Sequence, residues 1–165
     1  MVARVLVAGI GNLFLGDDGF GPEVVRRLAA APEKLPPGVR VTDYGIRGMH
    51  LAYDVLDGYH ALVLVDALPE NGRPGMVEIL RITADDLGRE EFDAHGMNPA
   101  AALSGVLRMG GTLPPTYLVG CRTGNVAEGI GLSPQAAAAV PQAVAAVHTL
   151  LARVVPPARI TEGRR

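Results

Sequence analysis

Three positions of the sequence have side chains suited to binding a metal ion: one of the adjacent Asp17 and Asp18, then Asp66, and His95. Asp18 follows Asp17 in a glycine-rich loop, Asp66 ends the apolar run 61–65, and His95 lies in a polar turn before a predicted helix. Two carboxylates and an imidazole form a ligand set that zinc or nickel accepts. If the three loops meet at one edge of a sheet, the sequence predicts a metal site there.

The acidic residues also have a purely structural interpretation. Aspartate is a favoured N-cap residue and its charge complements the helix dipole, so Asp17 and Asp18 could cap the helix expected at 19–31. Capping needs only one of them, and Asp66 could likewise cap a loop. The remaining histidines are interpreted as surface or packing residues: His50, His60 and His148.

Other chemistries fit the sequence less well. The turn at Gly9 and Gly11 has the opening of a dinucleotide fingerprint, but Phe14 stands where a third glycine is needed, and the acidic pair would repel a pyrophosphate. Ser104 lies inside a predicted helix and lacks a glycine-flanked elbow. Cys121 is expected to act as a small buried hydrophobe.

The elements that must position these groups alternate along the chain. Strands are expected at 2–8, 39–43, 61–65, 76–82 and 116–120, and helices at 19–31, 49–56, 99–109 and from 134 onward. This alternation predicts an α/β fold with a mostly parallel sheet, covered by helices on both faces. The ligand crevice of such a sheet lies beyond the carboxyl ends of its strands, where the adjacent Asp17 and Asp18 and, from another strand, Asp66 are expected.

Two further local features concern the outer elements. The run 76–82 alternates apolar and polar residues and is expected at the sheet edge. Ser133 is expected as the N-cap of the last helix, with Pro134 at its first position. Pro141 is expected to kink or break that helix.

Composition limits the function further. The 165 residues fit one domain, expected over 1–155 and followed by a disordered tail at 156–165. The 15 Lys and Arg against 17 Asp and Glu leave no surplus of positive charge, which argues against nucleic-acid binding. A single cysteine excludes an intrachain disulfide framework. The absence of an export signal or an uninterrupted apolar span favours a cytoplasmic protein without membrane insertion.

An ordered set of motifs over about 150 residues resembles the hydrogenase maturation proteases. A single glycine turn would be weak support, whereas the ordered series is specific. The matching segments are Gly9-x-Gly11-Asn12, 16–22 (GDDGFGP), 43–49 (DYGIRGM), 65–67 (VDA), 95–97 (HGM), Val119-Gly120 and 128–134 (EGIGLSP).

The resemblance implies a twisted five-stranded sheet and an endopeptidase activity. Such proteases remove a short C-terminal extension from the large-subunit precursor of a nickel–iron hydrogenase once nickel is in place. It implies that Asp18, Asp66 and His95 act as catalytic residues by binding this nickel, which arrives with the substrate, so the isolated protein is not expected to hold a metal tightly. Asp43 and Gly45 match a loop that meets the substrate.

One segment departs from the pattern of the family. The segment 121–123 (CRT) stands where members often have a proline-containing turn.

Three alternative functions are left open at this point. The same triad could hold a resident zinc or nickel in a hydrolase of a small substrate, which would retain metal tightly. A non-catalytic metal-binding module usually has His- or Cys-rich tracts, whereas this chain has 4 His and 1 Cys. A nucleotide-binding domain would be stabilised by nucleotide.

Overall fold

A five-stranded sheet forms the centre of the molecule, in a computed structural model that describes residues 3–69, 72–87 and 99–155. The strand order is β2-β1-β3-β5-β4, and only β4 runs antiparallel to its neighbour. The strands are β1 (Val5–Ile10), β2 (Val39–Gly45), β3 (Ala61–Leu68), β4 (Val77–Ile82) and β5 (Thr116–Arg122). The predicted fold class is therefore confirmed, and β4 is an edge strand as expected.

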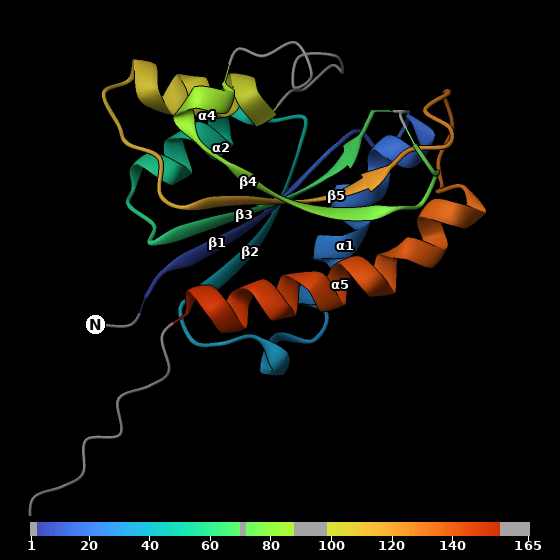
Figure 1. The fold of residues 1–165 in the computed structure, drawn as a ribbon, viewed down its shortest axis with the longest axis horizontal. Helices are drawn as coiled ribbons and strands as arrows, with labels where there is room; N and C mark the ends of the chain where they lie inside the picture. The colour runs from blue at the N-terminus through green and yellow to red at the C-terminus, as the bar shows by residue number, and fades with distance from the viewer. Residues whose placement is uncertain (1–2, 70–71, 88–98, 156–165) are drawn as a thin grey trace, which may run out of the picture.

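Helices cover both faces of this sheet. The main ones are α1 (Phe20–Ala29), α2 (Gly48–Leu56), α4 (Pro99–Arg108) and α5 (Pro134–Val154). Figure 1 shows α1 and α5 on one side of the sheet and α2 and α4 on the other, which agrees with the contacts within each helix pair. The result is a three-layer α/β domain.

The side chains of the central strands alternate between two apolar clusters. Val5 and Val7 of β1 pack under α1 and α5, whereas Leu6 and Ala8 point to the face covered by α2 and α4. Strands buried on both faces need apolar residues at every position, which explains the continuous run in β3.

The last helix is continuous through Pro141, so the predicted kink or break does not take the form of a break. Proline removes one N–H and leaves the carbonyl of Ala137 without its usual partner. Ala137 is exposed, so water can satisfy that carbonyl at little cost. Ser133 caps the helix as predicted and accepts a hydrogen bond from the Ala136 N–H at 3.3 Å.

By length and composition α5 could cross a membrane, since its 21 residues include an 18-residue window of mean hydropathy 1.3. Its buried face packs against α1 and β5. Core helices of soluble proteins pass the same test, so one such helix is weak evidence for a membrane span.

The expected tail at 156–165 lies outside the described residues.

Candidate active site

The candidate site lies at the topological switch point, where the chain reverses its direction of winding across the sheet. β1 pairs with β2 on one side and with β3 on the other, so that Gly9 stands between Asp43 and Val65. The chain leaves β1 toward β2 and leaves β3 toward the opposite edge. A crevice at the carboxyl ends of β1 and β3 is therefore the expected ligand site of the fold.

Asp17 and Asp18 lie in a short 3-10 turn, η1 (Gly16–Gly19), between β1 and α1. The N-cap of α1 is Gly19, and no side chain caps that helix. Neither aspartate therefore has the capping role that the sequence left open.

Asp17 is buried and fully engaged in holding two loops together. Its carboxylate accepts hydrogen bonds from the N–H groups of Gly124 (2.8 Å), Asn125 (3.1 Å) and Ser133 (2.7 Å), and from the Ser133 hydroxyl (2.8 Å). Burial alone would raise the pKa of Asp17, but these hydrogen bonds outweigh it and hold the pKa below its usual value. Asp17 thus has a structural role.

Asp18 is half-buried and has lone pairs to spare. One oxygen accepts a hydrogen bond from the Asn12 N–H at 2.8 Å, and the described residues provide no second donor. Of the two adjacent aspartates, Asp18 is therefore the one whose carboxylate can bind a ligand.

Asp66 lies on β3, close enough to Asp18 for their charges to interact. It is only 8% exposed, and its one hydrogen bond within the described chain comes from the Ala67 N–H at 2.8 Å. Burial, and then the charge of Asp18, raise the pKa of Asp66 well above its usual range. A buried carboxylate beside a second one is a poor structural choice, but it suits a site that receives a cation.

The third predicted ligand, His95, lies outside the described residues. Within those residues no group of three His, Cys, Asp or Glu side chains is placed to hold a metal ion. The donor set that the structure does bring together is the pair Asp18 and Asp66. Two carboxylates leave room for an imidazole and for ligands from a substrate, and this combination fits nickel or zinc.

Asp43 and Gly45 lie at the same sheet edge, at the end of β2. The exposed Asp43 carboxylate accepts a hydrogen bond from the Gly45 N–H at 2.8 Å, and Gly45 has a φ of +54° that favours glycine. The Gly45 carbonyl in turn accepts from the Gly11 N–H at 3.0 Å. This turn is therefore fixed to the loop that carries Asp18.

The remaining candidates are placed as the sequence predicted. Cys121 is 1% exposed, and burial, followed by the charge of Asp17, raises its pKa to about 11. Such a thiol is unsuited to nucleophilic catalysis. His50 and His60 are exposed and His148 is half-buried.

Sequence reasoning missed the role of the segment 124–133, which follows β5. Besides donating to the Asp17 carboxylate, this segment accepts two backbone hydrogen bonds. The Gly129 carbonyl accepts one from the Gly16 N–H (2.9 Å), and the Asn125 carbonyl accepts one from the Asp17 N–H (2.7 Å). We call residues 124–133 the latch segment. These contacts are more than 100 positions apart in the sequence, so no local signal could reveal them.

The geometry defines a doubly wound α/β domain whose acidic groups meet at the switch point, where this class of protein binds its ligands. A family model described as hydrogenase maturation protease matches residues 22–150. The chain therefore belongs to the hydrogenase maturation protease family and is a peptidase.

Individual relatives agree with this assignment. The hydrogenase 2 maturation protease of Escherichia coli is 31% identical over 150 residues, which is 90% of each chain. The hydrogenase maturating endopeptidase HybD from E. coli superposes with a TM-score of 0.76 at 29% identity, over 91% of this chain and 93% of that one. The hydrogenase 2 maturation peptidase of a Thaumarchaeota archaeon gives 0.70 at 31% identity, over 90% and 98%.

Proposed function

We propose that the protein removes a short C-terminal extension from the large-subunit precursor of a nickel–iron hydrogenase after nickel has been inserted. The observation that carries this proposal is the pair Asp18 and Asp66 at the switch point, in a chain of the maturation protease family. Among the described residues the pair supplies oxygen ligands for a cation and leaves coordination positions for further ligands.

In this proposal Asp18, Asp66 and His95 bind the nickel carried by the precursor. Carboxylate and imidazole ligands suit nickel, and three protein ligands leave positions for atoms of the substrate. The shared ion would hold the peptide that follows it in a fixed orientation and could polarise the scissile carbonyl as a Lewis acid. Water then adds to that carbonyl and the amide bond breaks, which yields the shortened subunit and a free peptide.

Asp43 and Gly45 are proposed to contact the precursor beside this site. The exposed carboxylate of Asp43 and the backbone of its turn are fixed to the loop of Asp18 through Gly11. We expect the reaction to take place in the cytoplasm.

The experiment that tests the function compares nickel-loaded and nickel-free precursor. Each is incubated with the protein, and the products are weighed by mass spectrometry. We expect loss of a C-terminal peptide from the loaded form alone. Equal cleavage of both forms would contradict nickel recognition, and no cleavage of either would contradict the function itself.

Variants test the ligand assignment. His95→Ala and Asp66→Asn are each expected to slow processing at least about 100-fold. Loss of a residue that only supports a metal ligand lowers activity by up to about 100-fold, and loss of a ligand itself should cost at least as much. Because Asp66 is a buried carboxyl group with one hydrogen bond in the described chain, Asp66→Asn should leave the fold as stable as before or stabilise it by about 1 kcal/mol. His60→Ala, at an exposed histidine directly before β3 and thus at the opposite end of that strand from Asp66, is the matched control and should process at the wild-type rate.

A further inference from the structure

A cavity of about 300 Å³ lies beside the candidate site, between α1 and the start of α5. Three parts of the chain line it: the loop that carries Asp18, the helix α1, and the end of the latch segment with the first turns of α5. Gly16 and Gly19, which bound the turn η1, both belong to its wall. A ligand in this cavity is therefore next to the residues that position Asp18.

The wall of the cavity is mainly aliphatic, and part of it is open to solvent. Leu132, Ala137 and Val140 line one side, and Leu13 lines another. Ile130 also belongs to the wall and is 81% exposed. An isoleucine this exposed at the rim of a cavity gains free energy when an apolar group covers it.

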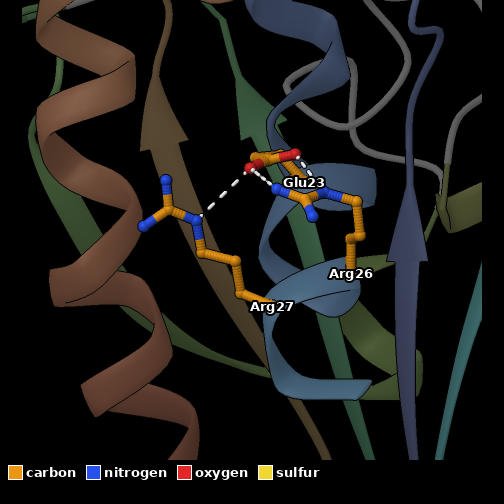
Figure 2. A network of polar contacts seen from close by, with 3 residues as sticks. All are labelled: Glu23, Arg26 and Arg27. Carbon is orange, nitrogen blue, oxygen red and sulfur yellow. Dashed lines mark hydrogen bonds and ion pairs between the residues drawn. The ribbon is translucent and has the colours of Figure 1, made fainter. Parts of the chain in front are cut away.

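One rim of the cavity carries a guanidinium with unused donors. Glu23 accepts two hydrogen bonds from Arg26, at 2.9 and 2.7 Å, and one from Nε of Arg27 at 3.3 Å. Figure 2 shows this arrangement on α1, with the terminal nitrogens of Arg27 turned away from Glu23. Within the described residues those nitrogens have no acceptor, so they can bind an anionic group.

A second cavity, of about 220 Å³ on the other side of α1, differs in charge. It is lined by Glu23, Arg26 and Asp43, which together carry one excess negative charge. The cavity next to Arg27 has no second carboxylate in its lining. Of these two cavities, the one next to Arg27 is the better suited to a ligand that combines an aliphatic group with a carboxylate.

We propose that the 300 Å³ cavity binds an extended peptide segment in which an aliphatic residue is followed by Asp or Glu. The aliphatic side chain enters between Leu132, Ala137 and Ile130, and the carboxylate pairs with the terminal nitrogens of Arg27. The volume is at the lower end for ligand pockets, which fits one side chain and its neighbours better than a whole small molecule. Resting on the proposed function, the inference places this segment in the precursor that the protease cleaves.

The latch segment connects this cavity to the candidate site. Ile130 and Leu132 belong to that segment, and its hydrogen bonds to Asp17 hold it against the turn that also carries Asp18. A peptide bound in the cavity therefore rests on the same rigid unit as Asp18. The cavity is thus a specificity site for the sequence near the cleaved bond.

Peptide binding tests the cavity without any cleavage. The probe is N-acetyl-Ser-Gly-Leu-Asp-Gly-Ser-amide, titrated into the isotopically labelled full chain and followed by NMR at low salt. Analogues carry Asn in place of Asp, or Ser in place of Leu. The wild type should bind the Asp peptide about threefold more tightly than the Asn peptide, as expected for an exposed ion pair. The Ser analogue should bind more weakly than either.

Variants assign the binding to this cavity. Arg27→Gln should reduce the ratio between Asp and Asn peptides to about one, whereas Arg153→Gln, at an exposed arginine far along α5, should keep it. Ala137→Phe fills the cavity from an exposed helix position and should weaken binding of the Asp peptide about tenfold. Ala138→Phe, at the next exposed position and outside the cavity lining, should bind as the wild type does.

Three outcomes would overturn the proposal: no binding by the wild type, no preference for the Asp peptide, or undiminished binding by Ala137→Phe. Failure of the proposed function has a separate signature. If the wild type binds the peptide but cleaves no hydrogenase precursor, peptide binding by the cavity is supported and the proposed protease substrate is contradicted. If the precursor is cleaved, Ala137→Phe should raise its KM while kcat at saturation is kept. Processing by Ala137→Phe at the wild-type KM would exclude this cavity from precursor binding.

Discussion

Two adjacent aspartates in the turn η1 have different tasks, and the difference comes from their hydrogen-bond partners. Asp17 accepts four hydrogen bonds and is 1% exposed, whereas Asp18 accepts one and is half-buried. A saturated carboxylate holds structure together, and an unsaturated one can bind a ligand. Of these two consecutive residues, Asp17 fixes the turn to residues 124–133, and Asp18 keeps lone pairs that can bind a ligand.

This difference predicts opposite effects of two neighbouring substitutions. Asp17→Ala leaves three N–H groups and a hydroxyl without their acceptor, and should destabilise the fold by about 3 kcal/mol or more. Asp18→Ala should cost about 1 kcal/mol or less but abolish processing of the precursor. Denaturant unfolding and precursor cleavage measure the two effects. Equal losses of stability in both variants would contradict the assignment.

At the same scale, the sequence alone identified the residue types but not their partners. Asp18, Asp66 and His95 follow from chemistry, topology and a family resemblance, and the structure brings the first two together. That Asp17 rather than Asp18 is the buried one depends on contacts with residues 124–133, which are distant in sequence. The cavity beside Arg27 needs two helices in contact and was equally beyond sequence reasoning.

At the scale of elements, the start of α1 lies unusually close to the strands that carry the site. A Cβ added at Gly21 would collide with the carbonyl oxygens of Ile10 and Val65, which end β1 and precede Asp66. Glycine therefore lets the helix approach the backbone of both strands. The first turn of α1 fixes the position of the crevice.

A pair of glycine substitutions tests this close approach. Gly21→Ala should destabilise the fold by about 1–3 kcal/mol, because backbone atoms cannot yield as a side chain can. Gly105→Ala, inside α4 with only an ordinary contact to Ala52, should instead stabilise it by about 0.4–1 kcal/mol. Thermal unfolding compares the two. A stable Gly21→Ala protein would show that α1 can shift without cost.

The sequence predicted the described strands and helices, but their ends were less certain. The strand expected at 61–65 extends to Leu68, because Asp66, Ala67 and Leu68 continue to pair with β5. A charged residue suggested a strand end, whereas the ladder depends on the partner strand. Pro141 likewise suggested a helix end, but exposure of the preceding turn allows the helix to continue.

The whole molecule is further stabilised by a polar network on the side of the sheet that α2 covers. The Tyr44 hydroxyl donates a 2.6 Å hydrogen bond to Asp54, which also pairs with Arg40 at 3.4 Å, and Arg40 donates to the Tyr59 hydroxyl. Burial, and then the bond to Asp54, raise the pKa of Tyr44 above its ordinary value of 10.0. The folded protein therefore keeps this proton at a pH where the unfolded chain loses it.

Global stability should accordingly depend on Tyr44 at alkaline pH. Its contribution is fully present below about pH 10 and is lost as the pH rises further, because only the unfolded chain ionises there. Tyr44→Phe should cost about 1 kcal/mol near neutral pH, and the difference from the wild type should shrink at about pH 11. Denaturant midpoints at both pH values provide the measurement. A constant difference would refute the linkage.

The latch segment has a consequence for the order of events during synthesis. Within the described part of the chain, the donors to the Asp17 carboxylate come from residues 124–133, so a nascent chain that has emerged only through β3 lacks the contacts that fix the turn carrying Asp18. Asp66 is already made by then, but it lacks a positioned neighbour. A ribosome-bound fragment that ends at β3 therefore lacks the fixed turn that presents Asp18, and the site that we propose can assemble only when translation of the last third of the chain is under way.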